Sequence, residues 1–149
     1  MPMRLDHITF ACSSLEQAAM FGRAEFRVEL PAGGRHPAMG THNLLTRIAP
    51  GVFLEFIAID PNASAPARPR WFALDRLSAS GALADGPRLL GWVASHDDLQ
   101  AARENQPQLV PPAITLTRDA LSWDTKAGHF GHCHVSQLRC CLAPLVGAG

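Results

Sequence analysis

The sequence of 149 residues has no long apolar run, no cluster of basic residues and few cysteines. No stretch approaches the roughly 20 apolar residues that a membrane-spanning helix needs, so we expect no membrane partner. The start of the chain lacks a basic segment followed by an apolar run, which argues against a secretory signal. The 13 basic residues balance 13 acidic ones without clustering, which argues against a nucleic-acid partner.

The four cysteines are too few and too unevenly placed for a disulfide framework. They are Cys12, Cys133, Cys140 and Cys141. We therefore expect a reducing, cytoplasmic location. With 47% hydrophobic and 17% charged residues, the chain can bury a sizeable interior, and we predict one folded domain over residues 1–149.

An internal repeat divides this domain. Residues 5–19 align with residues 89–102 when Leu15 is placed on Leu99, an offset of 84 residues. Each segment has the pattern of an apolar strand, a polar break and the start of a helix. The repeat predicts two modules of similar construction.

Turn signals divide the first module, about residues 4–60. A first helix should end near Phe26, and Gly33-Gly34 and Pro50-Gly51 separate three candidate strands. These strands are residues 27–30, 44–48 and 52–59. The order is βαβββ, followed over about 61–88 by a proline-rich linker and a short helix. The second module, about 89–149, should repeat the order.

His7 lies in a strand with two different faces. In "LDHITFA" the alternation of a strand places His7 and Thr9 on one face, with Ile8 and Phe10 on the other. The apolar face should pack against helices. A half-buried histidine bonded to nearby backbone is one interpretation of His7, and a functional residue is the other.

Glu55 lies in the middle of the apolar strand "VFLEFIAI". An unpaired buried charge is costly, so Glu55 needs a partner, a metal or a raised pKa. An arginine such as Arg47 or Arg70 could pair with it. Alternatively, a histidine and a glutamate on two strands of one sheet can supply two ligands to a divalent metal.

The segment "GGRHPAMGTHNLL", residues 33–45, carries more polar side chains than a plain connector needs. His36 and His42 can donate, accept or shuttle a proton. The amide of Asn43 can bind a carbonyl or carboxylate, and Arg35 adds positive charge. A hairpin loop whose polar side chains bond to their own backbone is the alternative.

Four segments together resemble the glyoxalase-like domain proteins of the vicinal oxygen chelate superfamily. They are "LDHITF", "GGRHPAMGTHNLL", "FLEFIAIDP" and "RPRWFALD", and the resemblance extends more faintly to about Trp123. It implies an α+β fold in which two βαβββ modules form a curved mixed sheet around a cleft, with a short or atypical second module. In metal-using relatives each module gives ligands from its first and last strands, which His7 and Glu55 match.

The second module departs from this pattern. Under the offset of 84, His7 corresponds to Gly91 and Glu55 to Arg139, and neither can ligate as expected. Two protein ligands are too few for tight binding unless substrate or another residue completes the shell. The cofactor that the resemblance implies is a divalent metal (zinc, iron, manganese or nickel), with no nucleotide.

Residues 128–141 concentrate three histidines and three cysteines. The spacing differs from the usual paired zinc ligands. A metal site, a last strand with buried thiols, and a tail that departs from the ancestral frame remain alternatives.

The resemblance implies an enzyme that acts on a small oxygen-rich organic molecule by lyase or isomerase chemistry. Glu55 would be the general base or a metal ligand, and His7 a ligand or an acid/base partner. The residues that would orient the substrate are Arg35, His36, His42 and Asn43. A small-molecule binding protein that does not turn its ligand over is the alternative. Relatives often pair, so we expect a homodimer.

Overall fold

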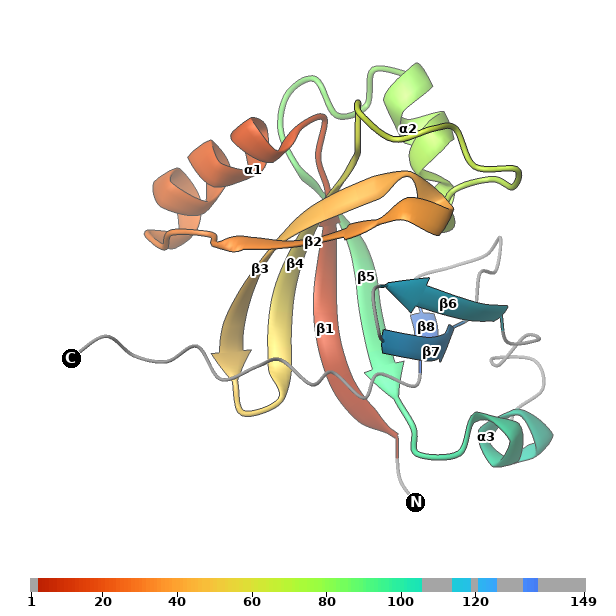
Figure 1. Cartoon of the computed structure of the whole chain (residues 1–149). Helices are drawn as coiled ribbons and strands as arrows, with labels where there is room; N and C mark the ends of the chain where they lie inside the picture. Colours follow the sequence, from red (N-terminus) through yellow and green to blue (C-terminus); the bar gives the residue numbers. More distant parts are fainter. Residues whose placement is uncertain (1–2, 106–113, 119–120, 126–132, 137–149) are drawn as a thin grey trace.

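The computed structural model of the protein describes residues 3–105, 114–118, 121–125 and 133–136 (Figure 1). Within these residues the main sheet has six strands in the order β2-β3-β4-β1-β5-β8, and β6 pairs with β7 in a second sheet. The strands are β1 (Arg4–Ala11), β2 (Ala32–His36), β3 (Thr41–Ala49), β4 (Val52–Ile59), β5 (Arg88–Ser95), β6 (Ile114–Arg118), β7 (Leu121–Thr125) and β8 (Cys133–Ser136). The α-helices are α1 (Leu15–Phe21), α2 (Leu74–Ala79) and α3 (Leu99–Asn105). Shorter helical turns are η1 (Gly22–Phe26), η2 (Pro37–Met39) and η3 (Trp71–Ala73).

The order of the elements confirms the predicted α+β fold. The βαβββ order occurs first as β1-α1-β2-β3-β4 and again as β5-α3-β6-β7-β8. The two modules meet where β1 pairs antiparallel with β5, while β4 and β8 lie parallel to β1 and β5. Figure 1 shows the sheet curling so that β2 crosses in front of β3, β4 and β1. The module boundaries given above remain predictions.

The strand register corrects one equivalence between the modules. Thr9 pairs with Glu55 in the first module, and Val93 pairs with His134 in the second. Thr9 and Val93 are 84 residues apart, which is the offset of the repeat (93 − 9 = 84). His134 on β8 therefore holds the position that Glu55 holds on β4, whereas Arg139 lies outside the described residues. Of the His/Cys-rich segment, only the backbone of β8 is described.

The predicted strand at residues 27–30 is wrong. Arg27 adopts a left-handed conformation (φ 56°) at the end of η1, which prevents an extended strand there. The second strand is instead β2, and it contains the glycine pair that was expected to form a turn. The chain reverses at η2, where Gly40 has φ 57° and its N–H bonds to the carbonyl of Pro37. The first helix and the strand at 52–59 are confirmed.

One face of the sheet packs beneath α1. A buried apolar cluster fills this helix face, as the alternation in β1 predicted. It contains Cys12, Ala18, Leu30, Leu44, Leu54 and Phe56, with Ile8 and Phe10 packed against it. The rings of Phe10 and Phe56 stack with centroids 5.0 Å apart. Burial of one such large side chain contributes about 1.5–3 kcal/mol.

The opposite face carries His7, Thr9 and Glu55, and we call it the polar face. One end of it is closed by a second apolar cluster, formed by Ala11, Leu74 of α2 and Leu83. α2, which contributes Leu74 to this cluster, is the short helix predicted from the sequence. No helix in the described part of the chain is both long and apolar enough to cross a bilayer.

Candidate functional site

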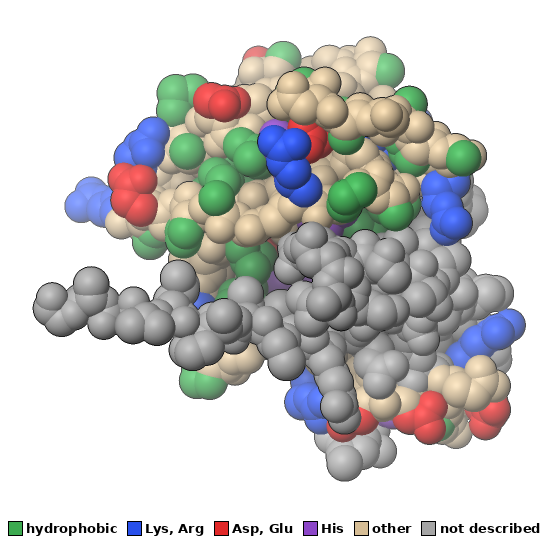
Figure 2. Space-filling model, in the orientation of Figure 1, with side chains coloured by type: hydrophobic (Ala, Val, Ile, Leu, Met, Phe, Trp, Pro, Cys, Tyr) green, Lys and Arg blue, Asp and Glu red, His purple; other side chains and the backbone are tan. Residues whose placement is uncertain are grey.

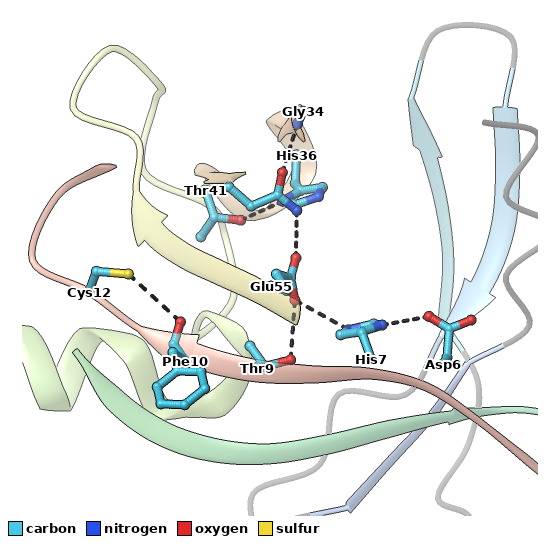
Figure 3. A network of polar contacts seen from close by, with 10 residues as sticks. Asp6, His7, Thr9, Phe10, Cys12, Gly34, His36, Thr41 and Glu55 are labelled. Carbon is cyan, nitrogen blue, oxygen red and sulfur yellow. Dashed lines mark hydrogen bonds and ion pairs between the residues drawn. The ribbon is translucent and has the colours of Figure 1, made fainter. Parts of the chain in front are cut away.

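Glu55 is the centre of a polar network on the polar face (Figure 3). Glu55 is only 7% exposed, yet its carboxylate has three side-chain partners. Asn43 Nδ2 donates to Oε1 at 2.5 Å, Thr9 Oγ1 donates to Oε2 at 3.2 Å, and His7 Nε2 lies 3.2 Å from Oε2. The partner that balances this buried charge is thus a histidine, and Arg70 pairs with Asp75 instead.

His7 lies between two carboxylates. Its Nδ1 is 2.6 Å from Asp6 Oδ1, and its Nε2 faces Glu55. Asp6 falls where the register of β1 against β5 shifts, between Leu5 and His7. The extra residue of such an irregularity re-aims a side chain. Asp6 is not among the site residues predicted from the sequence, although it directly precedes His7.

The pKa values of the pair move apart. Burial by itself would lower the pKa of His7, but the charge of Glu55 and hydrogen bonds to both carboxylates outweigh it and raise this pKa to about 9. Burial would raise the pKa of Glu55, but the charge and hydrogen bond of His7 outweigh it and lower the value to about 2. At neutral pH the two residues therefore form an imidazolium–carboxylate ion pair.

The glycine pair of β2 contacts the amide oxygen of Asn43, on the side away from Glu55. The backbone N–H of Gly34 donates to Asn43 Oδ1 at 2.7 Å. A Cβ atom on Gly33 would lie 2.2 Å from that same oxygen, so glycine is needed here for close approach. Both ends of the Asn43 amide are thus used, and the amide fixes the orientation of the Glu55 carboxylate.

His36 lies on β2 beside this network. Its Nδ1 is 3.1 Å from Thr41 Oγ1, and its ring meets that of Trp71 edge to face with centroids 5.2 Å apart. The charge of His36 also helps to lower the pKa of Glu55. His36 therefore belongs to the surroundings of the carboxylate.

Two further predicted residues lie apart from the network. His42 pairs with Ala58 and alternates with Asn43 along β3, which places it on the helix face. Its charge acts on Glu16 of α1. Arg35 is 65% exposed, and its Nη1 lies 3.3 Å from Asp60 Oδ2. The structure thus joins His7, Glu55, Asn43 and His36 but separates His42 and Arg35 from them.

His7 and Glu55 fit a divalent ion as a pair of ligands. Two donors bound at about 2.1 Å to one ion lie roughly 3 Å apart, close to the 3.2 Å between Nε2 and Oε2. A carboxylate on the other ring nitrogen, as Asp6 provides, is the usual support for a ligating histidine. Among the residues that the structure describes, no third histidine, cysteine or acid joins the pair to make a metal-holding group.

The surface of the described residues carries charges of both signs in the view of Figure 2. Figure 2 shows arginine side chains scattered among acidic and hydrophobic ones, without an extended basic patch in the described region of this view. This distribution agrees with the balanced charge of the sequence.

Solved structures share this fold at low sequence identity. A hypothetical protein from Staphylococcus aureus is 16% identical with a TM-score of 0.57, and the match covers 92% of this chain but 59% of that one. A methylmalonyl-CoA epimerase in complex with methylmalonyl-CoA and NH4+ is 15% identical with a TM-score of 0.58, covering 94% of this chain and 97% of that one. The methylmalonyl-CoA epimerase from Mycobacterium tuberculosis is 12% identical with a TM-score of 0.51, covering 89% and 86%. At these identities the likeness shows the fold alone.

Comparison with curated proteins gives no match for the sequence. Comparison with protein families matches residues 5–127 to the family described as Glyoxalase-like domain. This match covers the first module and the second as far as β7, and it agrees with the repeated order of the elements. The chain therefore belongs to the glyoxalase-like domain family.

Proposed function

We propose that the protein is an enzyme of the glyoxalase type, which moves a proton next to a carbonyl group of a small oxygen-rich organic molecule. The observation that carries this proposal is the buried ion pair of His7 and Glu55 on the polar face. Lyase and isomerase reactions both need such a proton transfer, and the pair combines an acid with a base.

The ion pair would become reactive when a ligand enters between its members. His7 has a proton to donate on Nε2, and a ligand carbonyl oxygen can accept that hydrogen bond in place of Glu55 Oε2. The bond would then strengthen as negative charge develops on the oxygen during proton removal. Glu55, without its cationic partner, would become more basic toward the neighbouring C–H.

Thr9 and Asn43 act as positioning residues in this scheme. Each donates a hydrogen bond to one oxygen of the Glu55 carboxylate. They keep the carboxylate fixed when its contact with His7 is lost. A fixed base loses less entropy on reaching the transition state than a freely rotating one.

A divalent ion held by His7 and Glu55 would supply Lewis-acid polarisation of the carbonyl oxygen. His7 would have to lose its Nε2 proton in order to ligate, so the ion and the proton compete. Zinc, iron, manganese and nickel are the candidate ions.

A non-catalytic binding protein of the same fold is the second candidate. The observation that favours it lies on β5, where Val93 and Gly91 pair with His7 and Thr9. Neither of these two residues offers a side-chain donor to the polar face, so β5 adds no ligand at these positions. A protein with half of a metal site could bind a small molecule without turning it over.

The test is exchange of a carbon-bound proton for deuterium, followed by proton NMR in D2O. The probes are methylmalonyl-CoA, 2-oxoglutarate and dihydroxyacetone, each with and without added zinc, manganese or nickel, and metal content is measured in parallel. We expect exchange with at least one probe and a loss of at least a hundredfold in Glu55→Gln.

The matched control is Glu29→Gln, which removes an exposed carboxylate that pairs with Arg23. It should leave the exchange rate unchanged. Binding of a probe without exchange, in every metal state, would refute the enzyme and support the binding protein.

A further inference from the structure

The open end of the polar face carries a cation, Arg47. The other end is closed by the cluster around Leu74. Phe53 of β4 pairs in register with His7 on one side and with Arg47 of β3 on the other. Residues paired in register share a face of the sheet, so Arg47 lies on the polar face. Leu5, also toward this end, is 43% exposed.

Arg47 has no acidic partner among the described residues, whereas several other arginines do. The ion pairs join Arg4 to Asp97, Arg23 to Glu29, Arg35 to Asp60, and Arg70 to Asp75. The guanidinium carbon of Arg47 instead lies 5.7 Å from the centre of the Phe53 ring. Stacking on an aromatic ring orients the plane of a guanidinium and leaves its N–H groups available.

The charges of the network make such a cation useful. Asp6 and Glu55 carry two negative charges and His7 carries one positive charge, which leaves one negative charge near the proposed reaction centre. An anionic ligand would be repelled unless a cation faced it. Arg47 lies one strand across and two residues along from Glu55, a backbone separation of roughly 8 Å from strand spacing.

We propose that Arg47 binds a carboxylate of the ligand whose carbonyl group meets His7, so that the substrate class is an oxo acid. The planar guanidinium would hold the carboxylate through two parallel hydrogen bonds. The ring of Phe53, half-buried between Arg47 and His7, would contact the carbon chain that joins the two ends of the ligand. This inference rests on the proposed function for the place of the carbonyl group.

The test compares 2-oxoglutarate with its uncharged dimethyl ester by isothermal titration calorimetry. We expect Arg47→Gln to raise the Kd of 2-oxoglutarate at least tenfold and to leave that of the ester within about twofold. Arg47→Lys, which keeps the charge but loses the planar fork, should fall between. The matched control is Arg76→Gln, which removes an exposed arginine of α2 and should change neither Kd more than twofold.

Three results would overturn the inference: no binding of 2-oxoglutarate to the wild type, equal affinity for acid and ester, or equal effects of the substitutions at Arg47 and Arg76. Melting temperatures of all variants would reveal any that misfold. If Arg47→Gln misfolds, the Kd of 2-oxoglutarate for Arg47→Lys decides the test instead. Arg47-dependent binding without deuterium exchange would support this inference and refute the proposed enzyme. Deuterium exchange into 2-oxoglutarate at the same rate in Arg47→Gln as in the wild type would support the proposed enzyme and refute this inference.

Discussion

The ion pair of His7 and Glu55 should make the stability of the protein depend on pH. The pKa of His7 rises from 6.5 to about 9 on folding. A raised pKa stabilises the folded state fully below the unfolded value, so this contribution is complete below pH 6.5. It is then lost as the pH rises through about 9. Stability should therefore fall from pH 6 to pH 9.

The magnitude follows from the size of the shift. A rise of about 2.5 pKa units corresponds to roughly 3 kcal/mol, since one unit is about 1.4 kcal/mol. The lowered pKa of Glu55 expresses the same ion pair and is not added to this figure. Its own contribution is present above pH 4.5 and is lost as the pH falls through about 2, so stability should be greatest between about pH 4.5 and 6.5.

Urea unfolding followed by far-UV circular dichroism at pH 6, 7.5 and 9 measures this dependence. The wild type should lose about 3 kcal/mol of unfolding free energy across the range. Glu55→Gln removes the charge that raises the pKa of His7, so most of this slope should disappear. Glu29→Gln, at an exposed surface pair, should keep the slope of the wild type.

Comparing the variants cancels the titration of groups outside the pair, such as the cysteine thiols. A wild type whose stability is flat from pH 6 to pH 9 would refute the ion pair. A slope that survives unchanged in Glu55→Gln would show that the carboxylate does not hold the proton on His7.

Two other predictions concern single contacts. Gly33→Ala should destabilise the fold by about 1–3 kcal/mol in thermal unfolding, because its Cβ would displace Asn43 and leave the Glu55 carboxylate short of a hydrogen bond; an unchanged melting temperature would contradict that contact. Cys12 is buried and its pKa is raised to about 12 by burial and then by the charge of Glu55, so peptide mapping should find it unalkylated by iodoacetamide at pH 8 in the native protein and alkylated in urea. Rapid native alkylation would show that the α1 packing opens easily.

Period-two alternation made the faces of the sheet predictable from the sequence. It placed His7 with Thr9 on one face and Ile8 with Phe10 on the other, and the structure agrees. The same rule separates His42 from its neighbour Asn43, but the predicted strand begins only at residue 44 and leaves both residues outside it. The observed β3 begins at Thr41, so the two side chains lie on opposite faces of the sheet.

The contacts of the site could not be predicted because they depend on register. Nothing local shows that Thr9 pairs with Glu55, 46 residues later, or that an irregularity falls at Asp6. The sequence of β2, "AGGRH", lacks strong strand formers, so its strand is set by pairing with β3 rather than by propensity. The left-handed conformation at Arg27 could not be predicted either, because a positive φ is usually indicated by a glycine and this position has none.

The contrast between the two faces of β1 also disfavours a wrong register between β1 and β4. If β1 slipped by one residue against β4, Phe10 would be forced toward the carboxylate of Glu55, and His7 would be pushed into the hydrocarbon beneath α1. Both exchanges cost free energy at once, because a buried charge loses its ion-pair partner while an aromatic ring loses its apolar surroundings. The residues that could do chemistry are thus also the ones that make a one-residue slip of the central strand unfavourable.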